Sequence, residues 1–332
     1  LDWLHLENTF SLVSGKLAEA IEGSDNLPFI PAPKLLTEVR TDFKKPYSDT
    51  TTSGNVTLAS DETLQPFTDA EKDTFMGLYR YANITMKHQS EAACFSDLVK
   101  DSVKVILATR KLNAQEEAYF KSRNLFPVTT KVAIDALALV VNKDNPDSLI
   151  KMSQLMDILS GKTSTWKQFN PSSPLGDITF VFDNNGSSNV RYLRDSVMKG
   201  QALPEYCFAA KSNPDVISYV ESHKNAIGVI GVAWISDFKD PAANQFLSRI
   251  KVLDVTTSAN PVYPDDYYKP YQAYIALQQY PLVREVYMIN REGRAGLGTG
   301  FVSFVAGDQG QRIVRMSGLL PATMPVRLIQ TN

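Results

Sequence analysis

Three short segments place hydroxyl, amide and acidic side chains directly in front of a predicted helix. They read LASDET, KHQSEAA and DNNGSSN. A helix N-terminus exposes unpaired backbone N–H groups and about half a positive charge, so it favours an anion. We therefore predict an oxyanion site, with the candidates Ser60, Asp61, Glu62, Thr63, Ser90, Asn185, Gly186, Ser187, Ser188 and Asn189. The alternative is that these residues only cap helices, because Ser, Asp and Asn are common N-caps.

An oxyanion site also needs positive charge. The apolar strand VKVILATRKL ends in Thr109 and Arg110. An arginine at this position can bind an oxyanion through two parallel hydrogen bonds, so we predict that both residues contribute to the site. The alternative is a surface arginine that pairs with a nearby acid, such as Glu116 or Glu117.

Carboxylates can make such a site selective. Asp61 can accept a hydrogen bond from a protonated anion such as hydrogen phosphate, and it repels a fully ionised one. Asp135 is a second, weaker candidate for this role. Arg191 follows the third segment and can add charge, unless it pairs with Asp195 at i+4.

Most signatures of catalysis are missing from the sequence. The three histidines, His5, His88 and His223, have no metal-ligand spacing, and neither a nucleophile elbow nor a P-loop occurs. We predict no cofactor, no metal site and no enzymatic activity. A hydrolase that uses Ser90 or Ser187 is the remote alternative, because no base is placed beside either serine.

Composition narrows the class of protein. The chain has 332 residues, which suits two α/β lobes, and its formal net charge is -2. Because a nucleic-acid binder usually carries a basic excess, we predict no nucleic-acid partner. The longest apolar run, residues 226–235, is too short to span a bilayer, so no direct membrane span is predicted.

Strands alternate with helices from residue 55 onward, which predicts a mainly parallel sheet flanked by helices in each lobe. Two long apolar strands, at 131–143 and 249–257, suggest two crossings between the lobes. We expect lobe I to comprise residues 51–135 plus 257–332, and lobe II residues 136–256.

The first 50 residues differ from the rest. WLHLENTFSL and KLLTEVRTDF alternate between apolar and polar residues, which predicts an appended strand pair before a polar linker. The pair, within residues 1–45, resembles barrel strands of TonB-dependent outer-membrane receptors. One interpretation is an inert appendage. The other is a docking element, which would make the protein an adaptor or sensor associated with such a receptor.

From about residue 54 to 328, the chain resembles, in the order of its segments, the phosphate-type substrate-binding proteins of ABC importers. Among these it is most similar in character to members from Bacteroidetes. The matching segments are VILATRKLNAQEE, KVAIDALALVVNKDNP, LMDILSGKTSTWKQF, DNNGSSNVRYL, NAIGVIGVAWI, YPLVREVYM and FVSFVAGDQGQRIVRMSGLLP. The resemblance implies a type II periplasmic binding fold, in which two α/β lobes joined by two crossover strands close on a ligand like a Venus flytrap.

The resemblance also implies residue roles. The first hydroxyl-bearing loop corresponds to Ser60–Thr63 and the helix-capping serine to Ser90. The family's R-x-D-G-S-G-T loop corresponds to DNNGSSN, but the family arginine falls at Asp183. An aspartate there repels a dianion unless it points away, so Arg110 is expected to supply the missing charge.

The function implied is capture of inorganic phosphate or a similar oxyanion for import. The resemblance further implies an ABC transporter permease as partner and a periplasmic location, and it admits a lipid anchor, as in a lipoprotein. Which oxyanion is bound stays open at this point.

Overall fold

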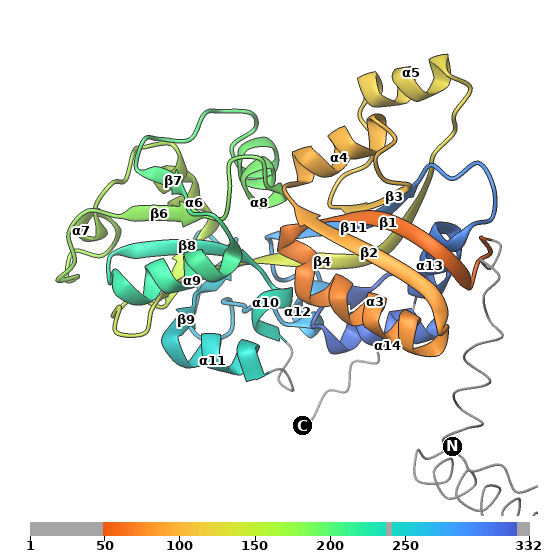
Figure 1. Ribbon diagram of the computed structural model, residues 1–332. Coiled ribbons are helices and arrows are strands. Elements are labelled where there is room, and N and C mark those ends of the chain that lie inside the picture. Colours follow the sequence, from red (N-terminus) through yellow and green to blue (C-terminus); the bar gives the residue numbers. More distant parts are fainter. Residues whose placement is uncertain (1–48, 237–240, 324–332) are drawn as a thin grey trace, which may run out of the picture. The chain divides into compact units, whose positions relative to one another are not determined.

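The computed structural model describes residues 49–236 and 241–323, so the strand pair predicted near the N-terminus lies outside the described residues. The chain divides into two units, 1–46 and 47–332, and every described residue belongs to the second. Strands and helices alternate through most of this unit, as the sequence predicts (Figure 1). None of the helices in the described ranges has the length and apolar character needed to cross a membrane.

The first three strands form a parallel sheet with β1 in the middle. The strands are β1 Ser53–Asp61, β2 Tyr81–Gln89 and β3 Val105–Ala108. The helices of this region are η1 Glu62–Leu64, α3 Gln65–Leu78, α4 Glu91–Val99, α5 Ala114–Ser122, α13 Leu297–Ala306 and α14 Asp308–Met316. In Figure 1, α4 and α5 lie on one side of the sheet and α3, α13 and α14 on the other. Because the strands are parallel, the loops that follow them open at one edge.

A single long strand, β4 (Val128–Asn142), joins this sheet to a second group of strands. Its first half pairs antiparallel with β11 (Val283–Asn290), which also pairs with β3. Its second half pairs antiparallel with β8 (Ala226–Gly231). The side chains of residues 136–141 are all fully buried. The long apolar run in the sequence therefore reflects a strand that is covered on both faces.

The second group is again parallel, with β6 between β8 and β7. The remaining strands of this region are β5 Leu149–Lys151, β6 Thr179–Phe182 and β7 Cys207–Ala209. Its helices are α6 Met152–Leu159, α7 Trp166–Phe169, α8 Ser188–Tyr192, α9 Asn213–Ser222, α10 Ala233–Ser236 and α11 Pro241–Arg249. A π-helical turn, Leu193–Val197, extends α8. The β6–α8 junction carries the segment DNNGSSN.

The second predicted crossing strand, 249–257, is instead two short strands, β9 (Ile250–Val252) and β10 (Asp254–Thr256). The strand breaks because it changes partner: β9 pairs with β4, and β10 pairs with β5. At the change, the Leu253 N–H donates to the Leu139 carbonyl. The boundaries predicted for the lobes stay predictions, since residues 47–332 cluster as one unit.

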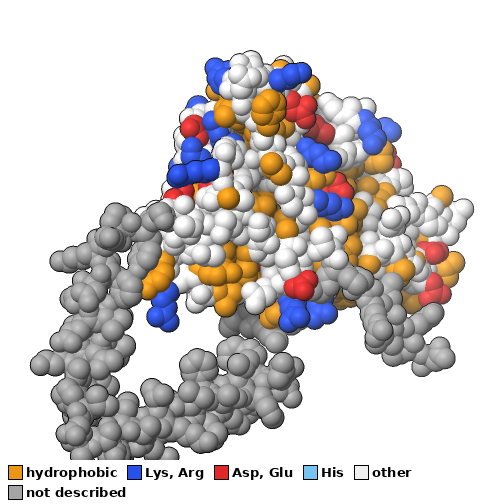
Figure 2. Space-filling model, turned by 90° about the vertical axis from the view of Figure 1, so that its right-hand side faces the viewer, with side chains coloured by type: hydrophobic (Ala, Val, Ile, Leu, Met, Phe, Trp, Pro, Cys, Tyr) orange, Lys and Arg blue, Asp and Glu red, His pale blue; other side chains and the backbone are white. Residues whose placement is uncertain are grey.

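The face shown in Figure 2 carries Lys and Arg side chains next to Asp and Glu side chains, separated by apolar and uncharged groups. Charges of both signs are mixed across this face. Such a surface provides no one-sign field for attracting a polyanion from a distance. An anion that binds at this face is therefore held by local groups.

Candidate functional site

The three donor-rich junctions lie against one another in the structure. The hydroxyl oxygen of Thr63, after β1, is 3.1 Å from that of Ser188, the first residue of α8. The backbone N–H of Ala92, in the first turn of α4, donates to the Gly186 carbonyl at 3.2 Å. A Cβ at Gly186 would lie 3.1 Å from the Ser90 hydroxyl. The glycine thus lets the third junction approach the second closely.

Arg284 lies at the centre of these junctions and was missed by the sequence analysis. It extends from β11, and the residue is only 5% exposed. Its Nη1 donates to the Ser188 hydroxyl at 2.9 Å and its Nη2 to the Thr63 hydroxyl at 3.2 Å. Its Nε donates to Asp135 Oδ2 at 2.9 Å. One guanidinium therefore joins the β1 junction, the β6 junction and β4.

Two fully buried carboxyl groups each keep one oxygen without a hydrogen-bond partner among the described residues, Asp61 Oδ2 and Asp135 Oδ1. Burial, reinforced by Glu91 and opposed by Arg284, raises the pKa of Asp61 to about 7. Burial also raises the pKa of Asp135, against the pull of Arg284. Asp61 can therefore switch between proton donor and proton acceptor near neutral pH.

Asn189 is fully buried, and neither its amide nitrogen nor its amide oxygen has a partner within the described residues. Leaving a buried amide unpaired costs about 1–3 kcal/mol. The residue lies next to Ser188, whose hydroxyl accepts from Arg284. A bound oxyanion can accept a hydrogen bond from a buried amide that is left unpaired in this way.

A second arginine, Arg191 on α8 after β6, reaches Thr109, which follows β3. The Arg191 guanidinium pairs with Glu91 at the start of α4 and donates to the Thr109 hydroxyl at 2.8 Å. Glu91 Oε1 also accepts from the Thr109 backbone N–H at 2.8 Å. Burial alone would raise the pKa of Glu91, but Arg191 and Thr109 outweigh it and lower the pKa. Glu91 is therefore ionised, and Arg191 is neutralised locally.

Asn213, the first residue of α9, contacts two further acids, Glu62 and Asp183. Its backbone N–H donates to Glu62 at 3.1 Å, and its side-chain N–H donates to the same carboxylate at 3.0 Å. The same amide nitrogen lies 3.4 Å from Asp183 Oδ2, and the Ser187 hydroxyl donates to Asp183 Oδ1 at 2.6 Å. Burial raises the pKa of Asp183 to about 6, with Ser187 opposing the shift. The two oxygens of Asp183 thus accept from Ser187 and Asn213, and neither accepts a hydrogen bond from Arg284.

Backbone contact also brings Thr63 close to the β8 strand. A Cβ at Gly231, the last residue of β8, would lie only 2.8 Å from the Thr63 carbonyl oxygen. Gly231 donates its own backbone N–H to Asn213 at 3.2 Å. A larger residue at 231 would push the β1 junction away from the end of β8.

Several predicted residues support the site through the backbone. Ser90 and Ser187 cap α4 and α8, accepting from Ala93 and Val190, as the capping alternative supposes. The Ser60 hydroxyl donates to the Asp61 carbonyl. Asn185 is exposed, and the structure does not bring it into the cluster.

Arg110 lines one groove with Thr109 and Arg191, but its guanidinium bonds none of the other predicted site residues. Its guanidinium makes two hydrogen bonds to Glu116, at 2.7 and 2.8 Å. It also lies over the Phe95 ring, 3.4 Å from the ring centroid. This is the pairing considered above as the alternative. The buried positive charge at the junctions comes from Arg284 instead.

The sequence carries one signal for Arg284. In β11, Arg284 is in phase with the buried residues Val286 and Met288, whereas Glu285 between them is exposed. A charged residue on the apolar phase of a strand must find a buried partner. Asn213, at the start of α9, carries no comparable signal.

A groove of about 880 Å³ opens beside the cluster. Thr109, Arg110, Arg191 and Arg284 contribute to its wall, together with Tyr192 and Tyr287. Within residues 49–236 and 241–323, His, Cys, Asp and Glu side chains form no group of three or more that could hold a metal ion. The cluster thus offers hydrogen-bond donors, guanidinium groups and carboxyls.

Comparison with known proteins defines the family. Residues 45–309 match the model of the PBP superfamily domain, and the chain belongs to this superfamily. The chain is similar to the phosphate-binding protein PstS of Staphylococcus epidermidis, with 27% identity over 197 residues. That match covers 58% of this chain and 57% of the relative, so the chain spans little more than half of that protein.

Two solved structures share the fold. One is described as a phosphate ABC transporter substrate-binding protein with bound phosphate from Clostridium perfringens, with a TM-score of 0.68 and 19% identity, covering 81% of this chain and 100% of that one. The other is an ABC-type phosphate transport receptor from Vibrio cholerae, with a TM-score of 0.59 and 17% identity, covering 81% and 100%. The two-lobed α/β binding-protein fold expected from the sequence is confirmed.

Proposed function

We propose that this protein captures phosphate, held by Arg284, Thr63, Ser188, Asn189 and Asp61. The observation that carries the proposal is the buried Arg284 guanidinium, which contacts hydroxyls from two junctions. The Asn189 amide, next in sequence to Ser188, is also buried and unpaired within the described residues. Buried charged hydrogen bonds are strong and geometrically selective. The names of the relatives, which are phosphate-binding proteins, support this choice of oxyanion.

Asp61 is proposed to select the protonation state of the ligand. More carboxyl groups than guanidinium groups surround the cluster. A dianion can therefore bind only if it shares a proton with one of these carboxyl groups. Asp61 has a free oxygen and a pKa raised by burial to about 7. Once ionised, the Asp61 carboxylate can accept a hydrogen bond from the O–H of hydrogen phosphate. Sulfate has no proton to donate, so the carboxylate only repels it.

Binding is proposed to occur without a chemical reaction. The Ser187 hydroxyl donates to Asp183 and the Ser90 hydroxyl caps α4, so both are engaged in hydrogen bonds. In the described part of the chain, His88 is bonded to Asp69 and His223 to the Tyr219 carbonyl. The captured anion is then delivered, in this proposal, to an ABC transporter permease outside the cytoplasm.

Isothermal titration calorimetry with phosphate, sulfate and molybdate tests the proposal on the purified chain. We expect phosphate to bind most tightly and Arg284→Gln to lose that binding. Arg110→Gln is the matched control, because the Arg110 guanidinium lines the same groove but is paired with Glu116 and bonds no residue of the cluster. If no phosphate binds, or if Arg110→Gln alone removes binding, the assignment is wrong.

A further inference from the structure

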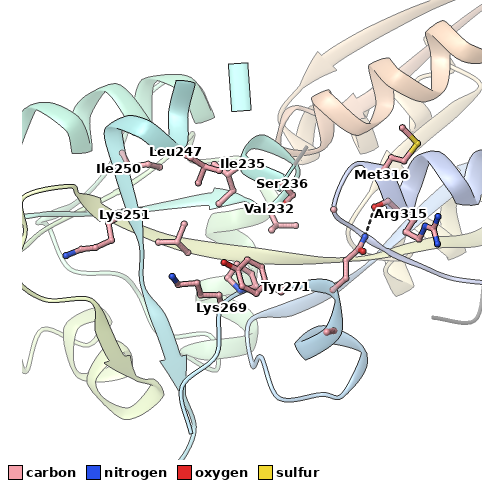
Figure 3. A pocket seen from close by; sticks show the side chains of 15 residues that line it. Val232, Ile235, Ser236, Leu247, Ile250, Lys251, Lys269, Tyr271, Arg315 and Met316 are labelled. Carbon is pink, nitrogen blue, oxygen red and sulfur yellow. Dashed lines mark hydrogen bonds between the residues drawn. The ribbon is translucent and has the colours of Figure 1, made fainter. Parts of the chain in front are cut away.

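A second cavity, of about 730 Å³, is lined by residues that take no part in the candidate site. Figure 3 shows its lining side chains. They come from α10 and the residue before it, from α11 and β9, from the start of α12 (Gln272–Ala276) and the residues before it, and from the end of α14 and the turn that follows. Its volume falls within the range of roughly 300–1,000 Å³ that is usual for small-molecule sites.

One wall of the cavity is apolar. In Figure 3, Ile235, Leu247 and Ile250 line the side formed by α10, α11 and β9, and Val232, just before α10, also lines the cavity. Tyr271 and Met316 also line the cavity and are 53% and 55% exposed. Large apolar side chains left open to water around a concave surface favour an apolar ligand.

The charged residues of the lining are all positive. They are Lys251, Lys269 and Arg315, and no Asp or Glu lines the cavity. Lys269 has only a loose ion pair, with its Nζ 3.6 Å from Asp254, and Lys251 donates to the Asn145 carbonyl. Within the described ranges, the Arg315 side chain has no ion pair. An anionic group is the natural complement of such a rim.

We propose that this cavity binds a small amphiphilic anion, with an apolar body against Val232, Ile235 and Leu247 and an acidic head group held by Lys269 or Arg315. The site is separate from the oxyanion cluster, because none of the residues proposed to hold phosphate lines this cavity. A ligand here would be chosen by its apolar chain as well as by its charge, unlike a bare oxyanion.

Decanoate is the probe, titrated into the full chain by calorimetry, with decanol and decyltrimethylammonium as neutral and cationic controls. We expect decanoate to bind at least about tenfold more tightly than either control. The double variant Lys269→Gln/Arg315→Gln should remove this preference. Lys162→Glu, a cation with a 75% exposed side chain outside the cavity, should leave it unchanged. Ala273→Phe, which fills the cavity, should abolish binding of decanoate.

Saturating phosphate separates the two sites. Decanoate affinity should be unchanged in its presence, whereas competition would place decanoate in the oxyanion cluster and overturn the proposal. Equal binding of decanoate and decanol would also overturn it, because the cations would then have no role. A third contrary result is binding that appears only after residues 324–332 are deleted, since that segment would then be the natural occupant.

Discussion

Arg284 on β11 and Asp135 on β4 form a fully buried ion pair, with Nη2 2.8 Å from Oδ2 and side chains that are 2% and 0% exposed. The remaining Arg284 donors point at Ser188 and Thr63. Asp135 thus orients the guanidinium from behind while the hydroxyl groups lie in front. A buried pair of this kind contributes little to stability by itself, so we attribute its presence to ligand binding.

Arg284→Gln is expected to weaken phosphate binding at least 100-fold, or about 3 kcal/mol, because a buried charged donor is lost. Calorimetry measures the loss. Arg284→Lys should keep the positive charge but lose the planar set of guanidinium N–H donors. Its phosphate affinity should therefore lie between those of Arg284→Gln and the unaltered protein. Full affinity in the lysine variant would contradict a role for the guanidinium geometry.

Asn189→Leu is expected to separate binding from stability. The substitution removes an unpaired buried amide, so the free energy of unfolding of the ligand-free protein should rise by about 1–2 kcal/mol, while phosphate affinity falls. Urea denaturation and calorimetry measure the two effects. The matched control is Asn213→Leu, which breaks hydrogen bonds to Glu62 and Gly231 and should lower stability. A stability loss in Asn189→Leu would mean that its amide is already satisfied.

Sulfate and phosphate should respond differently to pH. The pKa of Asp61 is raised to about 7, so the carboxyl is protonated below that pH and can donate to either anion. As pH rises through 7, the carboxylate repels sulfate but can still accept the proton of hydrogen phosphate. Sulfate affinity should therefore fall more steeply than phosphate affinity between about pH 6 and 8. Asp61→Asn should bring the two pH profiles together, and parallel profiles in the unaltered protein would count against the mechanism.

Glu71 should make the fold less stable at alkaline pH. Both carboxyl oxygens are buried without partners in the described structure, on the same face of α3 as Phe67 and Phe75. Burial raises the pKa of Glu71 to about 9. An acid with a raised folded-state pKa stays protonated in the fold while it ionises in the unfolded chain, so stability falls as pH rises from about 4.5 to 9.

Glu71→Gln removes that titration. Relative to the unaltered protein, the variant should gain several kcal/mol of unfolding free energy between pH 5 and 8, roughly in step with pH. Urea denaturation at several pH values measures the difference. Asp73→Asn, at an exposed position of the same helix, is the control. A constant difference across this pH range would show that Glu71 does not titrate there.

Local rules made the junctions predictable from the sequence. Strand alternation, helix caps and small residues depend on neighbours within a few positions. The sequence therefore predicts Ser90 as a cap and admits capping as the alternative for Ser187, and both residues cap helices. Arg284 and Asp135 are 149 positions apart, and their pairing depends on the register between β11 and β4. Arg110 was a reasonable candidate at a strand end, but the choice between an acid and a ligand depends on where α5 places Glu116.

The segment at 249–257 shows the same limit. Its apolar pattern predicts a strand, and the residues are extended, but a change of partner at Leu253 divides it. Hydrophobic pattern reports burial and does not report which strand lies alongside.

The pairing of β4 with both β11 and β8 has a consequence for how the protein unfolds. Since one continuous strand supplies backbone hydrogen bonds to both β11 and β8, neither sheet can lose it without exposing unpaired amides in the other. Heating should therefore give one calorimetric transition for residues 47–332, and the amide protons of β4 should be among the last to exchange with solvent deuterium.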